Sequence, residues 1–310
     1  MNNKQNEKWG FILNPTAGNY FGEKYLSTVE KAIKQRNLDG EIALTQFKHH
    51  ATEIAENFYS AGYRNIVAVG GDGTINEIAT FLSTKDDVVM GIIPAGTGND
   101  TVQNMGFPNR FRDEDWDALF AKNVIRMDLG VCNGNIFLNG MGIGFDAQVA
   151  AQNYNENGEV KKSGGDKYLW HILKTLFSYK ENHFTFLNEH IDKSNLYFMT
   201  TYSNGRRFAG KYFITPEAVA NDGLLDVCLV GKINVFQRLK LFMQVPEGKH
   251  MSDKKNVSYF KTKHISIEFD NKIAYHLDGE LHFDNQFEIE IIPEQLQVIY
   301  KKNGNHFFNV

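Results

Sequence analysis

Cysteine is scarce in this sequence, which has two among 310 residues. Cys132 and Cys228 stand alone in apolar stretches without a CxxC spacing. We therefore expect two reduced, buried thiols rather than a disulfide or a metal site. An excess of positive charge is also missing, because the formal net charge is −4. This balance argues against nucleic acid as a partner and leaves only a local basic cluster to contact an anionic membrane.

Long apolar runs are absent as well. The longest candidate, residues 168–179, is interrupted by His171 and Lys174, so it falls short of the ~18 apolar residues of a membrane span. The first residues, MNNKQNEKWG, contain no apolar leader. We therefore expect a cytoplasmic protein that does not cross a membrane, with peripheral contact at its inner face left open. The length suits about two globular domains.

The first hundred residues alternate short apolar runs with amphipathic stretches. This pattern predicts strands at 9–13, 42–47, 66–69 and 88–93, and helices at 23–35, 51–61, 74–82 and from about residue 97. Such alternation is typical of βαβ units around a parallel sheet. In these sheets, ligands bind at the carboxyl ends of the strands.

After the apolar run at 124–131, short strand-like segments dominate. They lie at 137–139, 196–202, 224–230, 265–269, 273–277 and 287–291, with helical patterns at 168–179 and 235–244. The predicted fold class is therefore α/β, with an N-terminal parallel-sheet domain (1–130) and a larger, mostly antiparallel, β-sandwich-like domain (131–295). The polar stretch 153–165 is expected to be a mobile loop.

Glycines gather where the third predicted strand ends, in GGDGTINE (70–77). Glycine permits a positive φ and lets another molecule approach the bare backbone. At a strand–turn–helix junction, exposed amides and a helix N-terminus attract an anion, most often a phosphate. Because Asp72 would repel a bare phosphate, it is expected to act through a magnesium ion, a bound water or a hydroxyl. The alternative is a tight turn in which Asp72 caps the next helix.

Two further loops share this character. PAGTGND (94–100) follows the fourth predicted strand and NPTAGN (14–19) follows the first. Thr97 is expected to cap the helix that follows it and to hydrogen-bond a phosphate. Three neighbouring parallel strands would then bring three phosphate-binding loops to one edge of the sheet.

The motifs NPTAG, GGDGTINE and PAGTGND, in this order and spacing, resemble the diacylglycerol kinase catalytic-domain family, which includes bacterial lipid kinases and sphingosine kinases. The blocks NGMGIGFDAQV (139–149), SNGRRFAGKYFITPEAVANDGLLDVCLV (203–230) and HLDGE (276–280) also resemble that family. The resemblance implies a two-domain, magnesium-dependent kinase with ATP in the cleft between its domains. It also implies that residues 296–310 return to the first domain, and it is compatible with a homodimer.

The resemblance also implies roles for individual residues. The expected ATP contacts are Asn14, Pro15, Thr16, Ala17, Gly18, Thr45, Gly70, Gly71, Asp72, Gly73, Thr74, Ile75, Asn76 and Thr97. Glu77 is expected to organise the loop or reach the ribose. A magnesium ion is expected at Asp222, with the main-chain carbonyls of Val219 and Leu224, although NDG alone reads as a type I′ hairpin turn. Asp72, Asp100 and Asp128 are expected to form an acidic network around the catalytic metal.

The sequence DGE (278–280) ends a strand-like run. If the backbone stays extended, Asp278 and Glu280 project to the same side, and one of them can accept a proton from the lipid hydroxyl. The family pattern favours Glu280 as the proton acceptor, with Asp278 as its rival. As a bare tripeptide, DGE is more often a surface turn.

Two segments bear on contact with lipid. A basic–aromatic cluster is formed by Arg206, Arg207, Phe208, Lys211 and Tyr212, and it suits either an anionic bilayer or a solvated loop. An apolar helical stripe is formed by Trp170, Leu173, Leu176 and Phe177. Core packing is the expected role of that stripe, and an acyl groove is the alternative.

The favoured function is transfer of the γ-phosphoryl group of ATP to a lipid hydroxyl, with diacylglycerol as the acceptor. Phosphatidylglycerol, sphingoid bases and other lipid alcohols stay open. A NAD kinase is a further alternative, because GGDG also occurs at a strand end in that distant relative. A nucleotide-binding regulator without catalysis is disfavoured by Asp72, Asp100, Asp222, Asp278 and Glu280.

Overall fold

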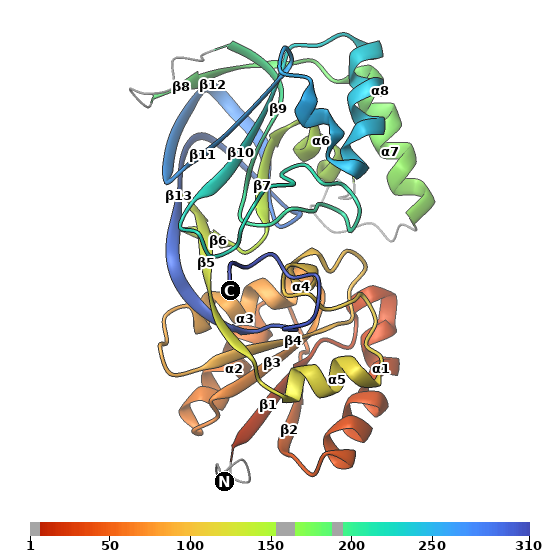
Figure 1. The fold of residues 1–310 in the computed structure, drawn as a ribbon, viewed down its shortest axis with the longest axis vertical. Helices are drawn as coiled ribbons and strands as arrows, with labels where there is room; N and C mark the ends of the chain where they lie inside the picture. Colours follow the sequence, from red (N-terminus) through yellow and green to blue (C-terminus); the bar gives the residue numbers. More distant parts are fainter. Residues whose placement is uncertain (1–6, 153–164, 188–194) are drawn as a thin grey trace. The chain divides into compact units, whose positions relative to one another are not determined.

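The computed structural model describes residues 7–152, 165–187 and 195–310. Nearly all of the polar stretch expected to be a mobile loop, residues 153–164, lies outside the described residues. The chain divides into two compact units (Figure 1). Unit 1 comprises Met1–Leu129, Ala220–Asp222 and Pro293–Val310, and unit 2 comprises Gly130–Val219 and Gly223–Ile292.

Unit 1 is built on a parallel sheet with the strand order β4-β3-β1-β2. Its strands are β1 (Lys8–Leu13), β2 (Asp39–Leu44), β3 (Asn65–Gly70) and β4 (Val89–Pro94). They alternate with helices α1 (Ala17–Gln35), α2 (His50–Ser60) and α3 (Asp72–Leu82). Strands β3 and β4 are buried along their whole length, which explains their continuous apolar sequences.

Four further elements lie wholly or partly in unit 1. Helices α4 (Asp100–Asn104) and α5 (Asp113–Phe120) follow β4, and β5 (Val124–Cys132) leads out of the unit. The last strand, β13 (Glu280–Ile299), returns to it: Val298 pairs in parallel with Met90 of β4. The last stretch of the chain, from Pro293 onward, thus belongs to unit 1.

Unit 2 is an antiparallel assembly in which the strand order β11-β10-β9-β7-β12-β13 forms the main path. Besides β13, its strands are β6 (Asn135–Phe137), β7 (Gly140–Gly144), β8 (Asn182–Phe186), β9 (Asn195–Ser203), β10 (Leu225–Gly231), β11 (Val257–Thr262) and β12 (His264–Leu277). Strand β8 pairs with β9 and β12, and β6 pairs with β5. One apolar core, which includes Phe184, Tyr202 and Phe287, joins these strands.

Three helices and two short 3-10 turns complete unit 2. The helices are α6 (Phe145–Ala151), α7 (Gly165–Ser178) and α8 (Val235–Gln244), and the turns are η2 (Val245–Glu247) and η3 (Lys249–Ser252). In Figure 1 the helices lie together beside β9. A second core, which includes Phe145, Leu176 and Leu241, joins them to β9 and β10. No helix in the described part of the chain combines the length and apolar character needed to cross a bilayer.

The predicted fold class is confirmed, and the two cysteines are buried and free as expected. Several local expectations were wrong. Helix α4 begins at Asp100, not near Thr97, because the glycine-rich loop extends to Asn99, which adopts a left-handed conformation. The NDG segment is not a type I′ turn, since within it only Gly223 has a positive φ. The expected strands at 265–269 and 273–277 are parts of one strand, β12.

Candidate active site

The loop after β1 is held in shape by Asn14. Its side-chain amide donates to Thr74 Oγ1 at 2.9 Å, and its carbonyl oxygen accepts from the Thr16 amide at 3.0 Å and the Thr16 hydroxyl at 2.9 Å. Gly18 has a φ of 60°, and a Cβ there would lie 2.2 Å from the Ala95 carbonyl oxygen. The first loop is thus bonded to the loop after β3 and packed against the loop after β4.

The loops after β3 and β4 also touch through bare backbone. The amides of Ala95 and Gly96 both donate to the Gly70 carbonyl, at 2.8 and 3.2 Å. A Cβ on Gly96 would lie 2.4 Å from the Gly71 Cα, so only glycine permits this approach. The predicted convergence of the three glycine loops at the carboxyl edge of the sheet is therefore confirmed.

Asp72 links two helices. It is the first residue of α3, yet its carboxylate accepts from the amides of Asp100 and Thr101, at 3.4 and 3.2 Å, at the start of α4. Burial raises the pKa of Asp72, and these amide donors oppose that shift. The alternative in which Asp72 caps the helix of its own turn was wrong: the carboxylate binds the start of α4 instead.

The other expected nucleotide contacts lie on or beside the same edge. Thr97 is exposed in the loop after β4 and does not cap α4, since that cap position is occupied by Asn99. Thr45 is buried at the end of β2, where its amide donates to the Leu13 carbonyl. Ile75 is buried in the core, so its side chain is unavailable to a ligand.

Glu77 organises the neighbouring loop. Its carboxylate accepts from the His49 amide at 3.0 Å, and its carbonyl accepts from the Thr52 hydroxyl. These contacts are made at the start of α2 and not within the glycine loop, so neither role expected for Glu77 is tested by them.

The three aspartates of the expected acidic network have different surroundings. Asp100 lies beside Asp72, as the hydrogen bond above shows. Asp128 is fully buried and accepts from the Glu294 amide at 2.8 Å. Its own amide donates to the carbonyl of Ala220, which precedes the NDG segment. Asp128 therefore joins β5 to two other chain segments of unit 1.

The NDG segment is tied to the far end of the chain. The Ala220 amide donates to the Phe307 carbonyl at 2.9 Å. The Asn221 side chain exchanges two hydrogen bonds with the backbone of Asn309, at 2.9 and 2.8 Å. These contacts fix the backbone immediately before Asp222.

The donor chemistry suits magnesium, which prefers oxygen ligands and retains water. In residues 7–152, 165–187 and 195–310, no three His, Cys, Asp or Glu side chains gather into a metal-binding cluster. A magnesium site there would depend on one carboxylate, such as Asp222, with main-chain carbonyl and water oxygens. The expected set of Asp222 with the Val219 and Leu224 carbonyls has this composition.

The DGE segment is a two-residue hairpin turn between β12 and β13. Leu277 pairs with Glu280, and the intervening Asp278 and Gly279 have φ values of 48° and 90°. Positive φ at both positions is characteristic of a type I′ turn. The expectation of an extended backbone was therefore wrong, and the argument that both carboxylates share one side no longer applies.

The two carboxylates of this turn differ in their surroundings. Asp278 accepts three backbone hydrogen bonds, from the amides of Leu138, Asn139 and Gly140, at 2.7, 2.9 and 2.9 Å. Among the described residues, the Glu280 carboxylate accepts no hydrogen bond, and the residue is half-buried. Asp278 is thus committed to the turn between β6 and β7, whereas Glu280 is available to a ligand.

A histidine–aspartate pair supports this turn, and the sequence analysis assigned it no role. His276 Nε2 lies 3.5 Å from Asp146 Oδ2, and both side chains are largely buried. Asp146 also accepts from the Thr201 hydroxyl at 3.3 Å, and the Gly279 amide donates to His276 Nδ1 at 3.4 Å. Both residues occur in the blocks GFDA and HLDGE. Asp146 could have been found as a carboxylate just after the glycine-rich strand β7, and His276 as a polar residue in an otherwise apolar part of β12.

The basic–aromatic cluster is largely engaged within unit 2. The Arg206 side chain donates to the Ala218 carbonyl at 2.6 Å, and the Arg207 guanidinium lies 4.4 Å from the Phe213 ring centroid. Tyr212 is buried, and only Lys211 is exposed. The segment therefore offers little basic surface to a bilayer.

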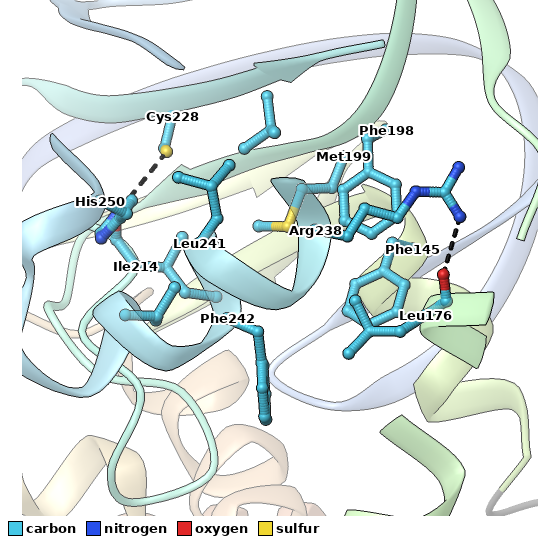
Figure 2. A pocket seen from close by; sticks show the side chains of 12 residues that line it. Phe145, Leu176, Phe198, Met199, Ile214, Cys228, Arg238, Leu241, Phe242 and His250 are labelled. Atoms are coloured by element: carbon cyan, nitrogen blue, oxygen red, sulfur yellow. Dashed lines mark hydrogen bonds between the residues drawn. The ribbon is translucent and has the colours of Figure 1, made fainter. Parts of the chain in front are cut away.

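An apolar pocket of about 50 Å³ lies between α7, α8 and the sheet of unit 2 (Figure 2). Its wall includes Leu176, Phe198, Cys228, Leu241 and Phe242. Burial raises the pKa of Cys228 to about 12, which keeps this thiol protonated and apolar.

The helical stripe beside this pocket is divided. Leu176 faces inward, whereas Trp170 and Phe177 are 65% and 63% exposed. The expectation of core packing was therefore wrong for these two residues.

Together, the folds and loops define a protein with an α/β unit, in which three glycine loops converge at the carboxyl edge of the sheet, and a β-rich unit. Residues 8–132 match the family model of the diacylglycerol kinase catalytic domain. Residues 130–300 match that of the YegS C-terminal NAD kinase β-sandwich-like domain. The chain therefore belongs to the diacylglycerol kinase family of lipid kinases.

Curated relatives agree with this assignment, and a solved structure has the same fold. The chain is 26% identical over 273 residues to the diacylglycerol kinase of Bacillus subtilis (strain 168), which covers 87% of this chain and 88% of that protein. It is 27% identical over 271 residues to "Probable lipid kinase YegS" of Escherichia coli O6:K15:H31, covering 86% and 87%. The crystal structure of a diacylglycerol kinase from Bacillus anthracis str. Sterne has the same fold, with a TM-score of 0.73 and 21% identity over 96% of this chain and 98% of that one.

Proposed function

We propose that this protein transfers the γ-phosphoryl group of ATP to the hydroxyl of diacylglycerol, with phosphatidic acid as the product and magnesium as the required ion. The observation that carries the proposal is the convergence of three glycine loops at the carboxyl edge of the unit 1 sheet. Phosphoryl transfer needs positioning and neutralisation of charge more than covalent chemistry from the protein. Glycine loops supply the first of these needs.

The nucleotide would be held mainly by backbone groups. The first-turn amides of α3, those of Asp72, Gly73 and Thr74, would donate to the phosphates, together with the Thr97 hydroxyl. The bond from Asn14 to Thr74 keeps two of the glycine loops in register. Asp72 would act on the phosphates through water or magnesium, because its carboxylate already accepts the amides of α4.

Magnesium would be held by oxygen donors, with Asp222 and the carbonyls of Val219 and Leu224 as the proposed set. When bound near a nucleotide, such an ion offsets the negative charge of the phosphates. Asp100 and Asp128 are proposed to hold water and backbone groups in order around the site.

Glu280 is proposed to accept the proton of the lipid hydroxyl. Its carboxylate accepts no hydrogen bond within the described chain, so it is free to receive one from a substrate. Asp278 is proposed to position the turn that bears Glu280, because its own oxygens accept three backbone amides.

The apolar pocket of unit 2 supports a lipid acceptor. Its lining is apolar apart from Arg238 and His250, and both of these donate or accept within the protein. A volume of about 50 Å³ admits only a few methylene groups. A full acyl chain would therefore require α7 and α8 to move apart.

The proposal is tested with ATP labelled on its γ-phosphate and four separate acceptors: diacylglycerol, phosphatidylglycerol, sphingosine and NAD. Label in phosphatidic acid, dependent on magnesium, supports it. Label only in phosphorylated NAD would contradict it, and the NAD kinase-like description of the C-terminal domain makes this comparison necessary.

The role of Glu280 has a matched control on the same strand. Glu280→Gln is expected to lower kcat by about 10²–10⁴-fold and to leave ATP binding unchanged. Glu290→Gln, which alters an exposed glutamate of β13, should leave both unchanged. Equal activity of the two variants would contradict the assignment.

A further inference from the structure

Helices α7 and α8 of unit 2 each present large apolar side chains to solvent. Trp170 and Phe177 of α7 are 65% and 63% exposed, and Phe236 and Met243 of α8 are 85% and 66% exposed. The side chains of such large residues are normally buried, and several gathered on one surface mark an interaction site. We define these four residues as the outer apolar face.

The two helices repeat one pattern of residues. On α7 the positions 170, 173, 174 and 177 are Trp, Leu, Lys and Phe, and on α8 the positions 236, 239, 240 and 243 are Phe, Leu, Lys and Met. Spacings of three, four and seven residues lie on one side of an α-helix. Leu173 is half-buried and packs against the second core, so the outward members on α7 are Trp170, Lys174 and Phe177, and those on α8 are Phe236, Leu239, Lys240 and Met243.

The opposite sides of the same helices are committed to the protein. Ile172 and Leu176 of α7 and Leu241 of α8 belong to the second core of unit 2. The four residues of the outer apolar face are therefore distinct from the residues that pack into the core. Each helix has one apolar side toward the core and other apolar side chains toward solvent.

Buried Arg238 fastens the two helices together. Its guanidinium donates to the carbonyls of Leu176 and Tyr179, at 2.8 and 3.0 Å, and pairs with Glu181 at 2.6 Å. In Figure 1, α7 and α8 accordingly lie side by side. The outer apolar face is thus carried by one fixed pair of helices.

The net charge of the two helices is basic, because the first turn of α7 carries both Asp166 and Lys167 and the rest of α7 and α8 carries no acidic residue. Residues 170–180 contain Lys174 and Lys180 and no acidic residue, and α8 contains Lys240 and no acidic residue. Lys174, Lys180 and Lys240 are exposed. Lysine can extend its charge toward lipid headgroups while its methylene groups stay in apolar surroundings. A surface with exposed apolar residues and a net basic charge suits an anionic bilayer.

We propose that the outer apolar face is the surface by which this protein docks on an anionic lipid bilayer. The aromatic side chains enter the boundary between headgroups and acyl chains, and the lysines contact the headgroups. The inner sides of the same two helices line the apolar pocket, through Leu176, Leu241 and Phe242 (Figure 2). A lipid leaving the bilayer would meet the pocket between them. The inference rests on the proposed function only in this last step.

Tryptophan fluorescence tests the docking directly. The chain has three tryptophans, and Trp9 and Trp116 are each 4% exposed, so only Trp170 can pass from water into lipid. Mixed phosphatidylglycerol–phosphatidylcholine vesicles at low salt should shift the emission to shorter wavelength and protect it from acrylamide. Trp170→Phe should abolish the shift. An unchanged emission with these vesicles would overturn the proposal.

Flotation with the same vesicles measures affinity. The double variant Phe177→Ser with Phe236→Ser should bind at least about tenfold more weakly, since each change removes one apolar side chain from the contact. Phe283→Ser is the matched control, an aromatic residue of unit 2 that is 59% exposed on β13. Equal loss of binding in both variants would overturn the assigned surface. So would a dimer, seen without vesicles, in which Trp170 is already shielded from acrylamide.

Failure of the surface and failure of the proposed function give different results. A protein that phosphorylates dispersed short-chain diacylglycerol but ignores vesicles lacks the docking surface. A protein that binds vesicles through Trp170 and phosphorylates no lipid retains the surface and refutes the proposed function.

Discussion

The strongest prediction concerns Asp278 and separates a positioning role from a chemical one. Its carboxylate accepts the amides of Leu138, Asn139 and Gly140, with Oδ1 taking two of these bonds and Oδ2 taking one. Asp278→Asn retains a residue that tolerates the φ of 48°. It replaces one acceptor oxygen by an NH2 group, which cannot accept from the amide facing it.

The magnitude follows from the bonds that are lost. A hydrogen bond to a charged group contributes about 1.5–3 kcal/mol, and an amide left without an acceptor adds to the loss. For a domain the size of unit 2, this corresponds to a fall in the unfolding midpoint of roughly 3–12 °C. Thermal unfolding followed by circular dichroism measures it, alongside the kinase rate. Because the turn bearing Glu280 loosens, kcat should fall as well.

Glu280→Gln provides the contrast. The Glu280 carboxylate accepts no hydrogen bond within the described chain. The unfolding free energy of the Glu280→Gln variant should therefore stay within about 0.5 kcal/mol of the parent value, while its kcat falls sharply. The reasoning is refuted if Asp278→Asn unfolds at the parental midpoint. It is also refuted if Glu280→Gln keeps its kinase activity while Asp278→Asn loses kinase activity without any loss of stability.

Three other changes test the loops and the second core. Gly96→Ala drives a Cβ to 2.4 Å from the Gly71 backbone, so nucleotide-induced thermal stabilisation should disappear, whereas Gly231→Ala, with its nearest atom 3.8 Å away, should keep it. Thr74→Val removes the acceptor of a loop-to-loop hydrogen bond and should weaken ATP binding about two- to tenfold in calorimetry. Burial lowers the pKa of His250 in the folded protein, so between that pKa and the ordinary value of 6.5 the unfolded chain binds more protons than the folded one. The free energy of unfolding, measured with urea, should therefore decrease as the pH is lowered from 6.5 through this range. His250→Gln should lose that part of the pH dependence, and an unchanged profile would contradict the assignment.

Much of unit 1 was predictable because its signals are local. Strands β1, β3 and β4 are apolar apart from the first residues of β1 and β3, Lys8 and Asn65, and each is followed by a loop that contains glycine, so their positions could be predicted within a few residues. Once those strands are parallel neighbours, their loops must converge. The family resemblance added the return of β13, since a single apolar run near residue 298 does not indicate its partner strand.

What sequence reasoning missed depends on contacts between distant segments. Nothing near Asp278 indicates that its carboxylate accepts amides about 140 residues away. The carboxylate of Asp72 likewise binds the next helix rather than its own, through loops whose meeting requires the folded sheet. The stripe on α7 looked like core because apolar periodicity does not distinguish one apolar side from two.

The discontinuity of unit 1 has a consequence for how the protein is made. Its compact body includes residues 293–310, and the buried strand β4 pairs with Val298 only when that last stretch has left the ribosome. Until then the edge of β4 lacks its covering strand, and an open edge invites pairing with other chains. Synthesis of a fragment ending near residue 130 should therefore yield aggregates, although that fragment contains all three glycine loops.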